Sequence, residues 1–214
     1  MEETKQKVQN MGRAGSHRGF SMIELMVVVG LIMIITAMAI VAYLPTLQDA
    51  RFDTAMREVI DQLRQGREYS IANRRYVAVT FPTVVVAGGT QYQVVLTQMN
   101  SLTAGAGAAN PVLSTTPLNY PAQYLIGGPD TPDGFCNGTP TAAVEFKTQA
   151  GGTPISILFQ SDGEVVDGAA YQPVNGTIFL AQPGKPSSAR AITVLGTTGR
   201  VRGWKGTGAT WFQF

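Results

Sequence analysis

An apolar segment of twenty residues, from Leu25 to Leu44, constrains the structure of this chain more than any other feature. No charged residue occurs between Glu24 and Asp49. Twenty residues in a helix span about 30 Å, which matches the hydrocarbon thickness of a bilayer. Residues 1–19 hold four lysines and arginines against two acids, and such an excess favours the cytoplasmic side. We therefore predict a membrane-spanning helix, with the chain that follows it outside the cytoplasm.

A secretory signal peptide is the alternative interpretation of this segment. Ala37-Met38-Ala39 has the Ala-x-Ala pattern of a cleavage site. However, the apolar segment is long for a signal peptide, an acid lies inside its beginning, and helical patterning resumes soon after the supposed cut. Under this alternative the mature chain would be a freely secreted, β-rich binding protein.

Glu24 stands at the start of the apolar segment and needs a partner. An ionised carboxylate in a bilayer costs about 2.5–3.5 kcal/mol on insertion scales and is seldom left alone. No basic residue lies within the segment. A cut between Gly19 and Phe20 would create a cationic amine four residues before Glu24. Cleavage at that bond would therefore supply the missing partner.

The sequence Gly-Phe-Ser-Met-Ile-Glu-Leu, residues 19–25, resembles the class III signal of type IV pilins and type II secretion pseudopilins. The resemblance implies that a prepilin peptidase cuts after Gly19 and methylates the new N-terminal Phe20. It also implies that Glu24 pairs with the terminal amine of a neighbouring subunit as the helices assemble into a filament.

The helix is expected to continue beyond the membrane, from about Ser21 to Asn73, with a bend at Pro45. Its polar face offers two ion pairs along the helix, Asp53/Arg57 and Asp61/Arg64. An apolar stripe at spacings of three and four predicts packing against a globular domain, and consists of Phe52, Met56, Val59, Ile60, Leu63 and Ile71.

From Tyr76 the apolar period changes to two, which indicates strands. The predicted strands are 76–81, 91–97, 143–147, 155–160, 176–181, 190–196, 199–204 and 209–214. Close spacing and turn sequences such as "SDGE" and "GTTG" favour an antiparallel sheet. The expected fold class is α+β: a long N-terminal helix, transmembrane in its first half, packed on an antiparallel β-sheet domain. The expected domains are a cleaved leader (1–19), a transmembrane and assembly helix (20–48) and a periplasmic head (49–214) with a surface insertion (100–141).

The order of these elements is similar to the GspH/FimT branch of minor pseudopilins and minor pilins. The segments that carry this likeness are 50–81, 157–168 and 189–204. It implies a single-pass inner-membrane protein that is assembled into a periplasmic pseudopilus or a surface pilus, where it supports filament assembly and protein secretion. The partners that it implies are a prepilin peptidase, other pilin or pseudopilin subunits and an inner-membrane assembly platform.

Catalytic and metal sites find little support in the sequence. The only histidine, His17, lies in the leader, which excludes a Ser/His/Asp or Cys/His site and a His-based metal cluster from the mature chain. The single cysteine, Cys136, cannot close a disulfide within the chain. We expect no enzymatic activity, no metal and no cofactor. Removing the leader leaves 12 basic and 12 acidic residues, so net charge predicts no partner.

The C-terminal segment raises one further possibility, DNA binding for DNA uptake. After Asp167 the chain has no acidic residue, but it has five basic residues and two tryptophans. The sequence Gly-Arg-Val-Arg at 199–202 resembles the GRxR motif of FimT-like pilins, and Arg200 and Arg202 would share one strand face. With Lys205, they are candidates for binding phosphates. The alternative, which we prefer, is that these charges protect an edge strand from aggregation.

Overall fold

The structure is a computed structural model that describes residues 20–87, 89–99, 110–119, 121–128, 130–134, 139–148, 157–168 and 171–214. The leader and Cys136 lie outside these residues. The chain divides into two compact units, Met1–Leu44 and Pro45–Phe214. Each unit is described by itself.

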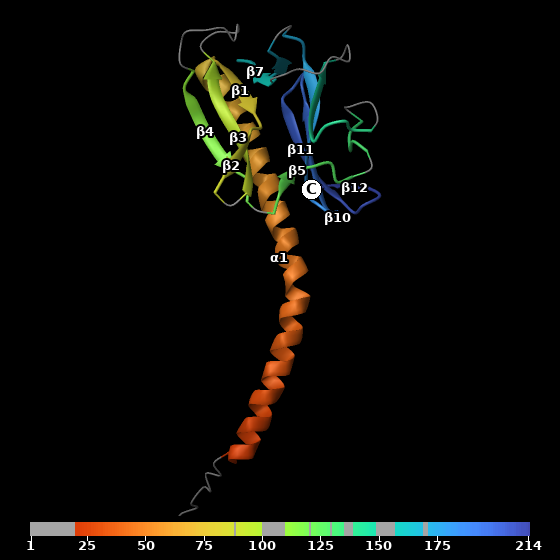
Figure 1. Ribbon diagram of the computed structural model, residues 1–214. Coiled ribbons are helices and arrows are strands. Elements are labelled where there is room, and N and C mark those ends of the chain that lie inside the picture. The colour runs from red at the N-terminus through yellow and green to blue at the C-terminus, as the bar shows by residue number, and fades with distance from the viewer. Residues whose placement is uncertain are drawn as a thin grey trace, which may run out of the picture. The chain divides into compact units, whose positions relative to one another are not determined.

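The long helix α1 comprises Met22–Asn73, which confirms the predicted helix within one residue (Figure 1). Its first part lies in the first unit, where the most apolar window has a mean hydropathy of 2.9 and no buried residue. By length and composition, α1 is the one described helix that could cross a membrane. Pro45 lies inside the continuous helix, at the boundary between the units.

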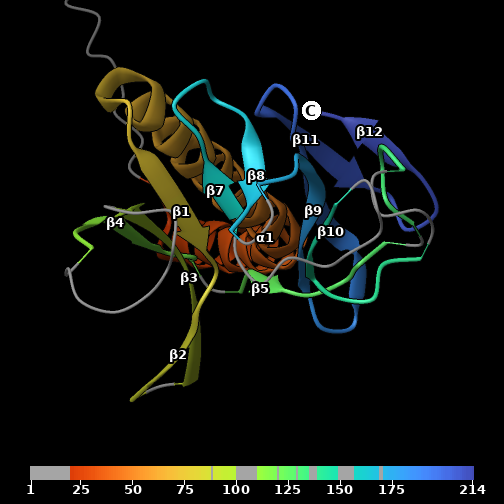
Figure 2. The ribbon, with the colours of Figure 1, turned by 90° about the horizontal axis from the view of Figure 1, so that it is seen from above.

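The second unit contains two antiparallel sheets that flank the second part of α1 (Figure 2). The first sheet has the order β2-β3-β1-β7-β8, with β4 also paired to β3. Its strands are β1 (Tyr76–Thr80), β2 (Thr83–Val86), β3 (Gly89–Met99), β4 (Val112–Pro117), β7 (Ile157–Phe159) and β8 (Val165–Asp167).

The second sheet has the order β12-β11-β10-β9-β5, with β6 also paired to β9. Its strands are β5 (Gln123–Tyr124), β6 (Val144–Thr148), β9 (Val174–Gln182), β10 (Lys185–Leu195), β11 (Arg200–Gly206) and β12 (Trp211–Gln213). The neighbouring strands of both sheets are antiparallel, so the predicted α+β class is confirmed.

The core of this unit lies between the two sheets and the apolar stripe of α1. The stripe is buried as predicted from Phe52 to Leu63, whereas Ile71 is 40% exposed because it lies in the last turn of the helix. The strand β11 packs closely on α1 at Gly203. A Cβ atom there would lie 2.9 Å from Cδ1 of Ile60, so glycine allows β11 to pack directly on the helix.

Four strands were not predicted, namely β2, β4, β5 and β8. Two of them lie within residues 100–141, which we expected to form a surface insertion: β4 pairs with β3 and β5 pairs with β9. Leu118 and Ala122, between these strands, are buried in the core. Part of the expected insertion therefore belongs to the sheets, because its few apolar residues fill space beside α1.

Candidate functional site

The N-terminal candidates lie in the first unit. Phe20 is 77% exposed and precedes α1, and the backbone N–H of Leu25 donates to the carbonyl of Ser21 (3.1 Å) as the helix begins. Glu24 lies in the first turn, is exposed, and has no hydrogen bond or ion pair with any described residue. A carboxylate in this turn interacts favourably with the helix dipole. Gly19 lies outside the described residues, and the processing roles of Gly19 and Phe20 and the assembly role of Glu24 stay predictions.

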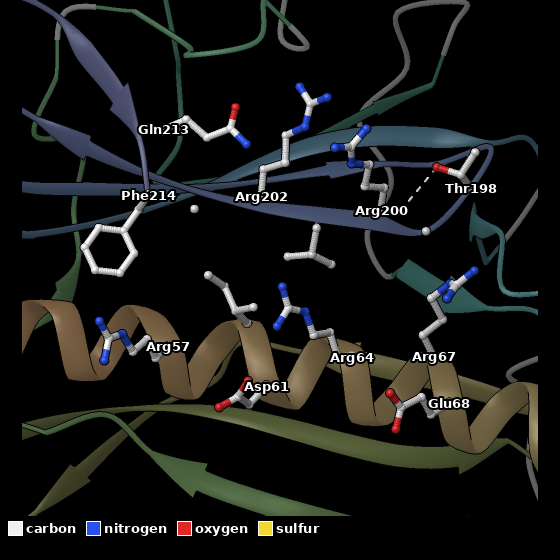
Figure 3. A pocket seen from close by; sticks show the side chains of 14 residues that line it. Arg57, Asp61, Arg64, Arg67, Glu68, Thr198, Arg200, Arg202, Gln213 and Phe214 are labelled. Atoms are coloured by element: carbon white, nitrogen blue, oxygen red, sulfur yellow. Dashed lines mark hydrogen bonds between the residues drawn. The ribbon is translucent and has the colours of Figure 1, made fainter.

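The C-terminal candidates lie on β11, which forms a hairpin with β10. Val201 and Gly203 are buried against the core, while the alternate residues Arg200 and Arg202 point away from α1 (Figure 3). The predicted shared face of these two arginines is therefore present. Arg200 is exposed and its side chain has no hydrogen bond or ion pair with any described residue. Lys205 is partly buried.

Arg202 differs from Arg200 because it has an acidic partner within the chain. Its Nη1 donates to Oδ1 of Asp133 at 3.4 Å, and the two side chains are 33% and 11% exposed. The other oxygen of Asp133 accepts from Oγ1 of Thr193 (2.6 Å), which in turn accepts from Nε1 of Trp204 (2.9 Å). This network attaches residues 130–134 to the outer face of the second sheet. Arg202 thus already has one carboxylate partner in this structure.

Arg190, one of the five basic residues after Asp167, is removed from the surface altogether. Its side chain is fully buried, and Nε donates to Oδ1 of Asp53 on α1 at 2.6 Å. The two ion pairs predicted along α1 are therefore wrong. Asp53 pairs with β10 instead of Arg57, and no ion pair between Asp61 and Arg64 is present among the described residues. Packing of the sheet on the helix brings a closer partner to Asp53 than its own helix offers.

A groove of about 760 Å³ lies between α1 and β11 within the second unit. Three helix arginines line it, Arg57, Arg64 and Arg67, and in Figure 3 the side chains of Arg64 and Arg67 rise from the helix toward β11. We call this feature the basic groove. Its lining includes five arginines and two acids: Arg57, Arg64, Arg67, Arg200, Arg202, Asp61 and Glu68.

Both ends of the basic groove are held by contacts of these arginines. At one end, Nε of Arg67 donates to the carbonyl of Gly163 in the β7–β8 turn (3.3 Å), and Gly199 packs against the same carbonyl. Gly199 has φ of 61°, and a Cβ there would lie 2.2 Å from that oxygen, so the turn before β11 requires glycine. At the other end, the guanidinium of Arg57 lies 5.0 Å from the ring centroid of Phe214.

Sequence reasoning missed the helix half of this groove. Arg57 and Arg64 are seven residues apart, which places them on one helix face. That spacing is the sequence feature from which a basic helix face could have been predicted. The proximity of this face to β11 depends on a contact across more than one hundred residues and on Gly203. No group of three or more His, Cys, Asp or Glu side chains able to hold a metal ion is present among the described residues.

Comparisons with known proteins bear on the N-terminal segment. No curated protein matches the chain significantly. The crystal structure of the type IV minor pilin FimU of Pseudomonas aeruginosa PAO1 shows a likeness with a TM-score of 0.38 and 15% identity, over 70% of this chain and 85% of that chain. A likeness at this level supports no conclusion. Residues 15–40 match the family described as "Prokaryotic N-terminal methylation motif". The resemblance of the N-terminal segment to type IV pilin-like proteins is thereby confirmed for residues 15–40.

Proposed function

We propose that this chain is a minor pilin or minor pseudopilin, a structural subunit of a type IV pilus or a type II secretion pseudopilus, with no enzymatic step of its own. One observation carries the proposal: the methylation motif of residues 15–40 runs directly into a 52-residue helix whose first part is apolar and exposed. Such a helix, with a single acid in its first turn, suits both storage in a membrane and packing in a helical filament core.

The proposal includes the processing and the partners of the chain. A prepilin peptidase would remove residues 1–19 and methylate Phe20, and the head from residue 49 onward would lie in the periplasm. Other pilin or pseudopilin subunits would contact the apolar part of α1, with Glu24 accepting the terminal amine of a neighbour. An inner-membrane platform would then add the subunit to the filament. Within this family we place the chain in the GspH/FimT branch.

The signal-peptide alternative has less support. The helix continues without a break through Ala37-Met38-Ala39 and onward to the core-packed stripe of the second unit. Cleavage there would separate the methylation motif from the head domain.

DNA uptake through β11 also has less support than the sequence suggested. Of its three candidate residues, Arg202 is paired with Asp133. Arg200 is the exposed one. A structural role is therefore the function that we prefer, and DNA binding remains an outcome that the binding experiment below can detect.

Processing and assembly can be tested in cells that have the corresponding machinery. Mass analysis of the purified protein should find a chain that begins at N-methylated Phe20. Glu24→Ala should insert into the membrane as well as the wild type does, because it loses a polar group, but should be depleted at least tenfold from sheared filaments. Ser21→Ala is the matched control and should enter filaments normally. A mature chain beginning just after Ala39 would contradict the proposal, as would normal incorporation of Glu24→Ala.

A further inference from the structure

The strand β11 has an edge that no described strand covers over its first part. β12 pairs with Trp204–Gly206, and the N–H of Phe214 donates to the carbonyl of Gly203 at 2.9 Å. In an antiparallel ladder the N–H and C=O groups of one residue point to the same side and alternate along the strand. Val201, two residues before Gly203, therefore presents its N–H and C=O at the same edge as β12, where Gln213 and Phe214 line the basic groove.

The charges beside this edge are suited to carboxylates. Arg57, Arg64 and Arg67 line the helix side of the groove, and Asp61 and Glu68 are interspersed among them. Arg57 and Arg64 are exposed, and Arg64 has no hydrogen bond or ion pair with any described residue. A guanidinium without a partner can bind a carboxylate through two parallel hydrogen bonds. The groove thus combines the free main-chain groups of Val201 with the unpaired guanidinium of Arg64, beside Arg57 and Arg67, which have no acidic partner among the described residues.

The helix arginines together span a length that three alternate positions of a strand can cover. Arg57 and Arg67 are ten residues apart, which is about 15 Å along the helix axis. Side chains on one face of a strand repeat every two residues, about 6.6 Å, so three successive ones span about 13 Å. In Figure 3 the helix and β11 run side by side along the groove. The arginines are unevenly spaced, since Arg64 lies seven residues after Arg57 and three before Arg67, so their long side chains would have to reach carboxylates at alternate positions of an added strand.

We propose that the basic groove binds an extended acidic segment of another subunit, which adds as a strand to the free edge of β11. Its carboxylates, at alternate positions, would face Arg57, Arg64 and Arg67, while its main chain would pair with Val201. Ile60 and Val201, both nearly buried, also line the groove. The inference rests on the proposed function only for the source of the segment, since the binding itself is a property of the single chain.

A nucleic acid fits the same groove less well. The side chain of Arg200, a candidate for binding phosphates, points away from the helix arginines (Figure 3). The free main-chain N–H and C=O groups at the edge of β11 can form hydrogen bonds with the main chain of a peptide. A phosphate backbone has no matching row of donors and acceptors.

The test measures binding of a synthetic peptide to the full-length chain in detergent. The probe is a fluorescein-labelled peptide with four Thr-Glu repeats, followed by fluorescence anisotropy at two salt concentrations. Saturable binding that weakens with salt is expected. Two N-methylated forms of this peptide keep its charge: one carries the methyl groups at the threonine nitrogens and the other at the glutamate nitrogens. In an added strand only one of these two sets of N–H groups faces β11, so one form should bind at least tenfold more weakly than the other. A third control peptide, with lysine instead of glutamate, should bind at least tenfold more weakly than the acidic peptide. Equal binding of the two N-methylated forms would overturn strand addition.

Protein variants locate the site. Arg57→Gln with Arg64→Gln should weaken binding at least tenfold, while the matched pair Arg51→Gln with Arg75→Gln, exposed but outside the groove, should change it less than twofold. Near-UV circular dichroism checks that both variants are folded. Equal affinities of the two variants would overturn the proposal, as would failure of the wild type to bind the acidic peptide.

A labelled single-stranded oligothymidine is measured in parallel. If it binds through Arg57 and Arg64 more tightly than the acidic peptide does, the ligand is a nucleic acid and the peptide proposal is wrong. The proposed function is judged separately, by the N-terminal mass and by recovery of the chain in filaments. A chain that enters filaments but does not bind the peptide would refute the groove proposal alone.

Discussion

The ion pair between Asp53 and Arg190 gives the strongest stability prediction. It joins α1 to β10, with the Arg190 side chain fully buried and the Asp53 side chain 24% exposed. Besides the Asp53 contact, Nη1 of Arg190 donates to the carbonyl groups of Ala189 (3.1 Å) and Ser187 (3.4 Å). Nη2 is buried and has no hydrogen-bond partner among the described residues. Loss of the carboxylate would therefore leave a buried cation with only carbonyl partners.

The expected cost of Asp53→Asn follows from these contacts. Removing one member of a buried ion pair costs about 3–5 kcal/mol. Asp53 is partly exposed and asparagine keeps one acceptor oxygen, so we expect a loss of about 2–3 kcal/mol in the free energy of unfolding. For a unit of this size the midpoint of thermal unfolding would fall by about 5–10 °C. Tryptophan fluorescence during urea and thermal unfolding of the detergent-solubilised chain measures both quantities.

Two further variants make this prediction refutable. Asp61→Asn on the same helix has no ion pair to lose and should change stability by less than about 0.5 kcal/mol. The double variant Asp53→Leu with Arg190→Met should recover most of the loss, because apolar residues of similar volume often replace a buried pair without cost. If Asp53→Asn were as stable as Asp61→Asn, the buried pair would not hold the helix to the sheet, and the reasoning would fail.

Two shorter predictions concern charged residues of the second sheet. Arg202→Gln should lower the free energy of unfolding by about 1 kcal/mol, because it breaks a half-buried ion pair with Asp133. Arg200→Gln, the control, should change the free energy of unfolding by less than about 0.5 kcal/mol. Equal midpoints of urea unfolding for the two variants would contradict this prediction. Burial raises the pKa of Glu145, but hydrogen bonds from Lys147 and from Thr141 outweigh it, so the pKa lies below 4.5. A lowered pKa in the folded state contributes stability above pH 4.5 that is lost as the pH falls through the folded value. Glu145→Gln should therefore be less stable near pH 7 and should lose less stability on acidification, as urea unfolding at pH 7 and pH 3.5 would show.

The helix could be predicted from the sequence almost to the residue because its determinants are local. The apolar segment and the stripe that follows keep the helical period throughout, and α1 ends at Asn73 just before Arg74, which has φ of 50°. A residue in the left-handed region is a common way for a helix to end. The long strands β3, β9, β10 and β11 were found for the same reason, since their runs of apolar and β-branched residues between turn sequences are visible locally.

The strands that were missed depend on contacts distant in the sequence. β5 has two residues and β8 three, too few for an alternating pattern to show. β4, Val-Leu-Ser-Thr-Thr-Pro, is mostly polar and half exposed, and it is a strand because β3 offers it a free edge. No rule of local sequence links Gln123 to Ala181 or Val94 to Thr116.

The C-terminal arginines show why a charge pattern in the sequence did not give the candidate site. Arg190, Arg200 and Arg202 look alike in the sequence, yet one is buried against Asp53, one is exposed, and one is paired with Asp133. Burial and pairing therefore remove two of the three from the charge that β10 and β11 present to a ligand. The positive charge of the basic groove comes mainly from the helix, where Arg57 and Arg64 lost their expected partners. One of those expected partners, Asp53, pairs with Arg190 instead. The contact that buries Arg190 on the strand therefore leaves Arg57 on the helix without an acidic partner.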